Sequence, residues 1–399
     1  MSANKKVIIV GGGFGGLNAA RKLGSVHGIN VILLDRRNHH LFQPLLYQVA
    51  MAGLDPGDIA TPIRTLLAKH PNVRVLLGNV TEVDLANKTL SCDFAKFEFD
   101  YLVLACGSQH SYFGHEDWEP FAPGLKSLEQ AVEIRRRVLT AFELAERETD
   151  PERVRQLLTF VVIGGGPTGV ELAGSLGEIT RFALSSDFRH IDPSQARIIL
   201  IEAGQTILST FEMESRKRAQ RDLENLGVTV WTGMRVTNVD ADGINLGSER
   251  VKAQTVVWAA GVKPAALNAI LGTPLDSSGR VIVGPDMSPI GHPEVFVIGD
   301  QAHFEQDGKP LPGLAPVAMQ QGRWAARLIR DEIRGKRRLP FRYKDKGQMA
   351  TVGRRKAVAE TNGIRFTGTL AWFAWLLVHI YYLIGFKNRA VVLFQWTWS

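Results

Sequence analysis

Two glycine-rich stretches in this sequence have the residue types and spacing needed to bind nucleotide phosphates. Gly11-Gly12-Gly13-Phe14-Gly15-Gly16 and Gly164-Gly165-Gly166-Pro167-Thr168-Gly169 both read G-x-G-x-x-G. Such glycines allow a tight turn and a close approach of the backbone to a pyrophosphate, and the N-terminus of a following helix favours the negative charge. One copy alone would be weak evidence, but the motif occurs twice in comparable surroundings. The sequence therefore predicts two dinucleotide-binding turns.

An acidic residue follows each glycine stretch at the distance expected for a ribose contact. These residues are Asp35 after the first turn and Glu202 after the second. A carboxylate at this place accepts from a ribose hydroxyl and repels a 2′-phosphate. No arginine directly follows Glu202, so the second turn is expected to prefer NADH over NADPH. Arg36 and Arg37 follow Asp35 and leave the ligand of the first turn open. A duplication with one degenerate copy remains an alternative, although both copies keep their glycines and their acid.

The elements that must position these turns are visible as apolar runs. Val7–Val10 and Phe160–Ile163 are short and fully apolar, which is typical of buried parallel strands, and each leads into a glycine turn. Helices are expected at 17–23 and 170–184, and Ser127 resembles the start of a capping box that opens a helix to about residue 148. Further strand-like runs are 101–105, 255–258 and 295–298. This alternation predicts an α/β protein with two doubly wound, Rossmann-like domains.

The composition excludes several other classes of protein. The 399 residues are 45% hydrophobic and 22% charged, a balance typical of folded globular domains. Cys92 and Cys106 are too few and too far apart for a disulfide framework, a zinc site or an iron–sulfur site. The absence of a C-x-x-C pair makes a disulfide reductase unlikely, and no metal site is expected. Residues 1–6 run straight into a strand, which leaves no room for a signal peptide and favours a reducing, cytosol-like compartment.

The C-terminal part differs from the rest in charge and apolarity. From Gln321 onward there are 16 Lys and Arg against 4 Asp and Glu, a net charge of +12, which leaves −5 for the first 320 residues. Residues 366–386 carry no formal charge. As a helix they would be about 31 Å long at 1.5 Å per residue, close to the ~30 Å hydrocarbon core of a bilayer, so length alone allows a span.

Three features favour a segment that lies in the membrane interface instead. His379 falls in its middle, aromatic residues are spread along it, and a second aromatic segment follows at 391–398. The basic clusters before it would be attracted to anionic lipids. A buried C-terminal helix pair with a solvated basic face is the alternative. Nucleic-acid binding is not expected, because the aromatic residues form an apolar block rather than alternating with Arg and Lys.

At this point the sequence resembles the flavoproteins with two dinucleotide-binding domains, in which an FAD domain is interrupted by an NAD(P)H domain. The stretch ending in Gly299-Asp300 resembles the one whose Asp contacts the flavin ribityl chain. The segments 104–108 and 258–262 look like the turns that pass close to the bound cofactors. Within this superfamily the chain is most similar to type II NADH:quinone oxidoreductases, on four stretches: 42–50, 166–173, 315–322 and 385–399. Pro316 stands where many members have Gln, and Met319 where some have His.

The resemblance implies FAD at the first turn, NADH as the substrate at the second, and transfer of two electrons to a membrane quinone without proton pumping. The implied FAD contacts are Gly11, Gly13, Phe14, Gly16, Asp35, Arg36, Pro44, Leu45, Ala105, Gly107, Gly299, Asp300 and Met319. The implied NADH contacts are Gly164, Gly166, Thr168, Gly169, Glu202, Ala260 and Gly261. The implied quinone contacts are Tyr47, Gln48, Gln320 and Gln321.

Three residues are candidates for catalysis, each with a simpler structural interpretation. Glu171 is expected in the first turn of the second helix, where an acid complements the helix dipole. The resemblance instead makes it a proton relay or a gate for the nicotinamide. Gln320 and Gln321 are expected to open a helix over 320–334, either as solvated residues or as polar groups for a quinone carbonyl. His39-His40 adjoins a flavin-like segment, but a loop histidine is more often structural.

The expected organisation has four parts and a membrane location. The FAD domain comprises 1–115 and 285–345, the NADH domain 116–284, and the membrane-anchoring segment 346–399. The enzyme would be peripheral and monotopic, bound by its tail to the lipid surface at the cytoplasmic face of the cell membrane. A homodimer is implied by resemblance only. The rival functions are a soluble NADH-dependent flavoprotein reductase with another acceptor and a non-catalytic flavoprotein that senses NADH.

Overall fold

The computed structural model describes residues 4–184, 186–361, 363–383 and 386–398. Residues 1–3, Gly385 and Ser399, on which parts of the expectations above rest, lie outside the described residues. The chain divides into two compact units. Unit 1 contains the chain up to Leu41 together with Ala60–Gln109 and Val262–Asp345. Unit 2 contains Phe42–Ile59, His110–Gly261 and the chain from Lys346 onward.

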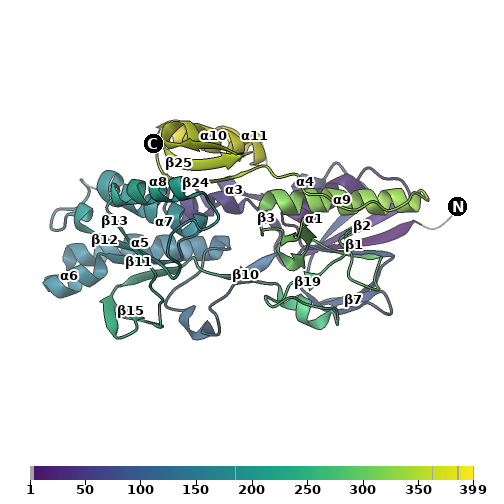
Figure 1. The fold of residues 1–399 in the computed structure, drawn as a ribbon, viewed down its shortest axis with the longest axis horizontal. Helices are drawn as coiled ribbons and strands as arrows, with labels where there is room; N and C mark the ends of the chain where they lie inside the picture. Colours follow the sequence, from purple (N-terminus) through teal and green to yellow (C-terminus); the bar gives the residue numbers. More distant parts are fainter. Residues whose placement is uncertain (1–3, 185, 362, 384–385, 399) are drawn as a thin grey trace. The chain divides into compact units, whose positions relative to one another are not determined.

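Unit 1 is built on a parallel five-stranded sheet with the strand order β20-β9-β1-β2-β5. The central strand β1 (Lys5–Val10) ends in four buried residues, as its apolar sequence predicts. Helices α1 (Phe14–Leu23) and α9 (Ala315–Ile333) pack side by side (Figure 1). A Cβ atom on Gly322 would lie 2.1 Å from the carbonyl oxygen of Gly15, so this close packing requires glycine. The other strands of the sheet are β2 (Ile29–Asp35), β5 (Val73–Leu77), β9 (Tyr101–Leu104) and β20 (Val295–Val297).

Smaller elements complete unit 1. An antiparallel sheet of β6 (Val80–Asp84), β7 (Thr89–Cys92) and β8 (Lys96–Glu98) contributes Val83 and Leu90 to a core shared with the main sheet. The short pairs are β3 (His39–Leu41) with β4 (Ala60–Pro62), β19 (Val281–Ile282) with β21 (Ala302–His303), and β22 (Glu305–Gln306) with β23 (Lys309–Pro310). The short helices are α4 (Ile63–Leu67), η5 (Ala266–Ile270) and η6 (Gly299–Gln301).

Unit 2 contains a second parallel sheet, with the order β13-β12-β11-β17. The capping prediction at Ser127 is confirmed, because its side chain accepts from the backbone N–H of Gln130 and α5 (Leu128–Arg147) begins there. The helix expected over 170–184 begins earlier, as α7 (Pro167–Glu178), and continues as a π-helical turn over Ile179–Ala183. The sheet strands are β11 (Thr159–Ile163), β12 (Arg197–Glu202), β13 (Val228–Thr232) and β17 (Thr255–Trp258). Other elements are η1 (Gln43–Leu45), α2 (Leu46–Ala50), α3 (Pro56–Ile59), α6 (Pro151–Leu157), α8 (Met213–Glu224), β14 (Asn238–Asp240), β15 (Gly243–Leu246) and β16 (Glu249–Lys252).

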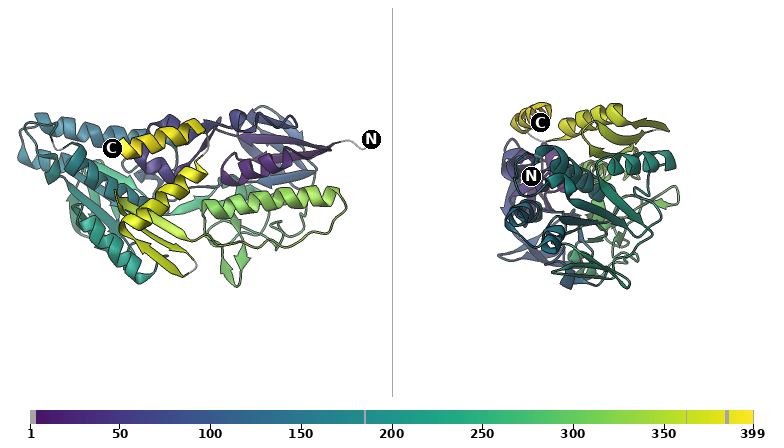
Figure 2. Two further views of the ribbon diagram at one scale, coloured as in Figure 1. Left: turned by 90° about the horizontal axis from the view of Figure 1, so that it is seen from above. Right: turned by 90° about the vertical axis from the view of Figure 1, so that its left-hand side faces the viewer.

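The C-terminal part of unit 2 is an antiparallel sheet followed by two helices. The sheet contains β24 (Gln348–Gly353), β25 (Lys356–Thr361) and β26 (Ile364–Thr367), and α10 (Gly368–Tyr382) packs on β25 (Figures 1 and 2). Helix α11 (Phe386–Trp398) follows. Among the described helices, none combines the length and apolarity that crossing a bilayer requires. The uncharged segment 366–386 is thus not one long helix, because its first two residues belong to β26 and α10 has only 15 residues. The α/β class with two Rossmann-like sheets is confirmed.

Candidate cofactor and substrate sites

The first glycine turn lies between β1 and α1 and is closed by its own backbone. Gly11 has φ +103°, and a Cβ atom on Gly16 would lie 1.8 Å from the Gly11 carbonyl oxygen. The Asp35 carboxylate accepts from the backbone N–H of Gly12 at 2.5 Å and from that of Arg37 at 2.7 Å. Asp35 therefore fixes the turn through one oxygen and the start of the next loop through the other.

The first turn is open to an anion. A Cβ atom on Gly13 would meet nothing within 4 Å. No side chain among the described residues caps α1, and its first turn carries no acid. The first N–H groups of a helix have no partner within the helix itself and can serve as the donors that a pyrophosphate needs.

His40 supports the first turn from behind. It is buried in β3, and its Nδ1 donates to the carbonyl oxygen of Gly12 at 2.9 Å. The ring of Phe14 meets the imidazole edge-on, with the ring centroids 5.1 Å apart. Burial lowers the pKa of His40 to about 4, so the imidazole is neutral at physiological pH. The sequence offers little reason to select His40, because only its position next to a flavin-like segment distinguishes it.

The second glycine turn, between β11 and α7, repeats the first. Gly164 has φ +112°, and a Cβ atom on Gly169 would lie 1.8 Å from the Gly164 carbonyl oxygen. The Glu202 carboxylate accepts from the backbone N–H groups of Gly165 and Gly204, both at 2.6 Å. Within the described residues α7 has no capping side chain and no acid in its first turn, in which Thr168 is exposed.

A polar cavity of about 230 Å³ lies in unit 1, next to the turns after β9 and β20. Its lining includes Ser108, Arg280, Gly299, Asp300 and Gln321. The Ser108 hydroxyl donates to Asp300 Oδ2 at 2.6 Å, and the Gly299 N–H donates to Gln321 Oε1 at 2.7 Å. The structure thus brings Gly299 and Asp300 together with Ser108, a residue that the pattern of cofactor turns includes but does not single out.

The two sheet-edge turns named in the sequence also meet the glycine turns. A Cβ atom on Gly11 would lie 2.3 Å from the carbonyl oxygen of Ala105, which precedes Gly107. In unit 2 a Cβ atom on Gly164 would lie 2.7 Å from the backbone nitrogen of Ala260, which precedes Gly261. Each glycine turn therefore lies against one of these two segments, whose contacts with the cofactors remain a prediction.

The expectation that Gln320 and Gln321 open a helix is wrong. Helix α9 begins at Ala315, with Pro316 in its first turn, a position that tolerates proline because its N–H would be unpaired anyway. Both glutamines therefore lie in the second turn. Gln321 is buried and holds Gly299, and the Gln320 amide exchanges two hydrogen bonds with the backbone of Lys344, at 2.9 and 3.0 Å. Met319 is also buried.

Glu171 lies one turn further into its helix than expected, because α7 begins at Pro167. It is 9% exposed, and burial raises its pKa to about 8, while the N–H of Thr351 in β24 opposes part of this shift. Tyr47 is buried nearby, and its pKa is raised by burial first and by Glu171 second. A carboxyl group that is largely protonated at neutral pH contributes little as a partner for the helix dipole. The simple structural interpretation of Glu171 therefore weakens.

The other residues expected at the cofactors and the quinone are divided between the units. Tyr47 and Gln48 lie in unit 2, where the Gln48 amide donates to the Tyr47 hydroxyl at 3.0 Å and accepts from the indole N–H of Trp396 at 2.8 Å. Pro44 and Leu45 also belong to unit 2. Gln320 and Gln321 belong to unit 1, as do the remaining expected FAD contacts.

Comparisons with known proteins agree with this geometry. Residues 5–322 match the family model described as pyridine nucleotide-disulphide oxidoreductase, and residues 346–399 match the NDH2 C-terminal domain. The type II NADH:quinone oxidoreductase Ndh of Mycobacterium tuberculosis is 44% identical over 408 residues, which cover 98% of this chain and 87% of that protein. A type II NADH:quinone oxidoreductase of Staphylococcus haemolyticus is 28% identical, with 92% of each chain covered. The structure of NDH2 from Plasmodium falciparum in complex with NADH has a TM-score of 0.89 at 20% identity and covers 99% of this chain and 98% of that chain.

Two dinucleotide turns, each with its acid, on two Rossmann-like sheets define a pyridine nucleotide-dependent oxidoreductase of the flavoprotein class. Within that class, the chain belongs to the type II NADH:quinone oxidoreductase family. The resemblance drawn from the sequence is thereby confirmed. The residues of unit 1 fit FAD, because the open face at Gly13, the uncapped helix start and the cavity at Asp300 offer what a pyrophosphate and a ribityl chain need.

Proposed function

We propose that this chain oxidises NADH by way of bound FAD and transfers two electrons to a membrane quinone, without proton pumping. One observation carries the proposal. This chain, a member of the family, has two complete glycine turns, and the acid of each turn accepts the same pair of backbone hydrogen bonds. FAD, when bound, supplies the redox chemistry, because it can accept a hydride from NADH and pass two electrons to the quinone. The protein binds the reactants, orients them and provides protons.

The second turn selects NADH through Glu202. Its carboxylate is fixed by two N–H groups, and the proposal is that this preorganised negative charge faces the ribose. A 2′-phosphate would be repelled there, and the next residues, Ala203 and Gly204, offer no positive charge.

Glu171 is the proposed proton donor for quinol formation. A carboxyl group with a pKa of about 8 carries its proton at neutral pH and can release it when a stronger base forms nearby. Tyr47 and Gln48 are the proposed neighbours of the quinone in unit 2, and Gln320 and Gln321 are proposed from unit 1.

The C-terminal helix α10 supports attachment to a lipid surface. Leu370, Phe373, Leu377 and Tyr381 lie along one face of α10 and are all more than half exposed. The opposite face, with Ala371 and Trp375, is buried. A row of exposed, large apolar side chains in a basic segment is typical of a helix that lies in the membrane interface.

Three finer assignments remain part of this proposal. The cytoplasmic face of the cell membrane is proposed because the basic tail would meet the anionic lipids of that leaflet. The proposed FAD domain is 1–115 with 285–345, the NADH domain 116–284 and the anchoring segment 346–399. Residues 262–284 nevertheless belong to the same compact unit as the first glycine turn, so the part of the chain around the FAD site extends further than the proposed boundary at 285. A homodimer is proposed from family resemblance, and sedimentation equilibrium would test it.

The central experiment is rapid mixing of the purified protein with NADH, followed by a short-chain quinone. We expect fast bleaching of the flavin absorbance by NADH and its recovery when quinone is added. Slow bleaching without recovery would favour an NADH sensor, and recovery only with a different acceptor would favour a soluble reductase. Release of the cofactor by heat and its chromatography would identify FAD.

Membrane attachment is tested with vesicles that contain anionic lipid. The triple variant with Leu370→Glu, Phe373→Glu and Leu377→Glu should no longer sediment with the vesicles. NADH should still reduce its flavin as in the wild type, because these side chains lie on the exposed face of α10. As a control, a double variant at exposed positions of α5, Val132→Glu with Glu143→Gln, should sediment as the wild type does.

A further inference from the structure

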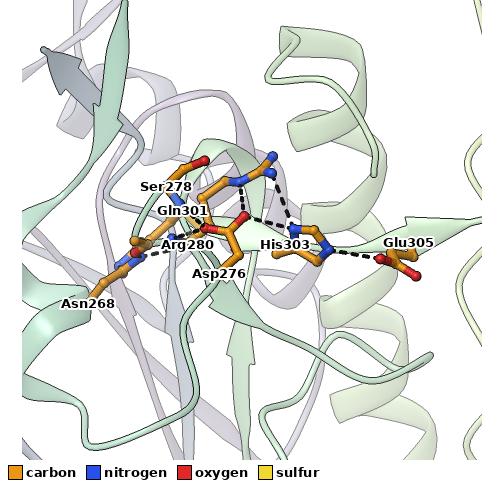
Figure 3. A network of polar contacts seen from close by, with 8 residues as sticks. Asn268, Asp276, Ser278, Arg280, Gln301, His303 and Glu305 are labelled. Atoms are coloured by element: carbon orange, nitrogen blue, oxygen red, sulfur yellow. Dashed lines mark hydrogen bonds and ion pairs between the residues drawn. The ribbon is translucent and has the colours of Figure 1, made fainter. Parts of the chain in front are cut away.

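Gln301 is a completely buried amide directly after Asp300, in the short helix η6. Its Oε1 accepts from the backbone N–H of Cys106 at 2.8 Å. Its Nε2 donates to Asn268 Oδ1 at 2.7 Å (Figure 3). A backbone N–H can only donate, so the orientation of the amide is fixed. Gln301 therefore connects the turn after β9 with the side chain of Asn268.

Asn268 continues the connection to a third turn. This residue is 2% exposed and lies in η5. Its Nδ2 donates to the carbonyl oxygens of Gly279 and Gln301, at 2.9 and 3.0 Å. Since carbonyl oxygens can only accept, the second amide also has a single orientation. We call Asn268 and Gln301 the amide pair.

The turn at Gly279 is itself held by charge. Asp276 Oδ1 accepts from the N–H groups of Ser278 and Arg280, and its Oδ2 accepts from Arg280 Nε at 2.8 Å. His303 Nδ1 lies 2.8 Å from the same Oδ2, and its Nε2 lies 3.1 Å from Glu305 (Figure 3). The network therefore holds the Arg280 guanidinium in place at the cavity wall.

The three turns that the amide pair joins all line the 230 Å³ cavity of unit 1. Ser108 comes from the turn after β9, Asp300 from the turn that contains Gln301, and Ser278 and Arg280 from the turn held by Asn268. The amide pair itself lies behind these turns and is not part of the lining. From this position the amide pair can set the distances between the three turns that form the cavity walls, but it cannot contact a ligand in the cavity.

We propose that Asn268 and Gln301 are positioning residues for the flavin: they hold the Ser108, Asp300 and Arg280 turns at the separation that FAD requires. This inference rests on the proposed function, since it assumes that the cavity beside Asp300 takes part of the flavin. Substitution of either residue of the amide pair should weaken FAD binding. The KM for NADH should not change in the fraction that holds FAD, because NADH binding depends on the second turn, in unit 2.

A Gln301→Glu variant gives this proposal a signature that general destabilisation lacks. When the new carboxylate is ionised, one oxygen still accepts from Cys106, but the other faces Asn268 Oδ1, and two acceptors in a buried site repel each other. When the new acid is protonated, its O–H can donate to Asn268 Oδ1 and restore the original pattern. FAD binding by this variant should therefore recover as the pH falls.

The test measures FAD retained per chain, the Kd for FAD and the flavin absorption spectrum across pH. Gln301→Met should raise the Kd about tenfold or more at every pH, because it leaves Cys106 N–H and Asn268 Oδ1 without partners. Gln301→Glu should match Gln301→Met near pH 8 and approach the wild type near about pH 5. The matched control is Asn72→Leu, which removes an amide that donates to Leu23 O and Ile29 O in the same unit. It should lower the Tm without changing the Kd for FAD or the spectrum.

The outcomes separate this proposal from the proposed function. Wild-type protein that neither contains nor takes up FAD would contradict the function itself. Wild-type protein that binds FAD, together with Gln301 variants that bind it equally well at every pH, would overturn only the positioning role. That role would also be overturned if Asn72→Leu lost as much FAD as Gln301→Met at an equal fall in Tm.

Discussion

The two glycine turns are nearly identical in their backbone and different in their surroundings. In each, the last glycine of the motif, Gly16 or Gly169, has no room for a Cβ atom. The acid accepts from the N–H of the residue between the first two motif glycines, Gly12 or Gly165, and from the N–H two residues after itself. The position two residues past Gly16 is Asn18, which donates to Phe14 O and accepts from Arg323. The equivalent position past Gly169 is Glu171, which is buried.

This difference separates what the two turns share from what each unit adds around its turn. Any bound dinucleotide requires a tight turn and a close approach of the backbone, so both glycine turns have the same backbone structure. The neighbouring helix positions are free to differ, and they supply a bonded amide in unit 1 and a buried acid in unit 2. If the proposed roles of Glu202 and Glu171 are right, selectivity and proton supply depend on the residues around the turns, and substitutions in the two copies should have different effects.

The largest effect is expected from Gly16→Ala compared with Gly169→Ala. Each new Cβ atom would overlap a carbonyl oxygen of its own turn, at a cost of about 1–3 kcal/mol of stability or more. Gly16→Ala should be purified with less than about a tenth of the wild-type FAD, since the distorted turn no longer presents its N–H groups. Gly169→Ala should keep FAD and raise the KM for NADH at least about tenfold. Absorbance ratios and steady-state kinetics measure both.

Gly13→Ala and Gly166→Ala complete this comparison. A Cβ atom at either position meets no protein atom within 4 Å, so the Tm of the protein without ligand should be unchanged. Any loss of affinity then reports the approach of the pyrophosphate rather than packing. Full FAD content in Gly16→Ala would show that the first turn does not hold the flavin.

A smaller, pH-dependent effect is expected from Glu171→Gln. The folded state keeps a proton on Glu171 up to a pKa of about 8, whereas the unfolded chain releases it near 4.5. Between these values the folded state binds more protons, so wild-type stability should fall as the pH rises from about 4.5 to about 8. The variant lacks this loss, and its Tm advantage should grow across that window and level off above it. The exposed Glu143→Gln on α5 is the control, and a Tm difference that is constant with pH would contradict the buried proton.

The smallest effect is expected from Glu202→Gln compared with Asp35→Asn. Removal of the negative charge at Glu202 should narrow the NADH over NADPH preference in kcat/KM by about tenfold, equivalent to about 1.4 kcal/mol. Asp35→Asn should leave this preference unchanged, because the first turn is proposed to hold FAD. An unchanged ratio in Glu202→Gln would mean that its carboxylate does not face the ribose.

The sequence predicts the regular parts of this molecule well for physical reasons. Apolar runs of only four residues that end in glycine are too short for helices and favour buried strands that lead into turns, so both sheets and both acids follow from local patterns. The helix starts at Pro167 and Ala315 were misplaced by three and five residues, because proline in a first turn looks like a helix breaker in sequence. The burial of Glu171 under β24 and the partnership of Asn268 with Gln301 join distant segments, and no local pattern records them.

The contact between α7 and β24 has a practical consequence for shortening the protein. The Val352 carbonyl oxygen lies where a methyl group on Gly174 would be, 1.7 Å from its ideal position, so β24 is fitted to α7 without spare room. A truncated protein without the apolar helices should therefore end at Thr367 and not before Lys346. The shorter truncation would remove β24 and expose α7, the helix that carries Glu171. Even the later cut would uncover Ala357 and Ala359, which pack against Ala371, and polar replacements there would be needed to prevent aggregation.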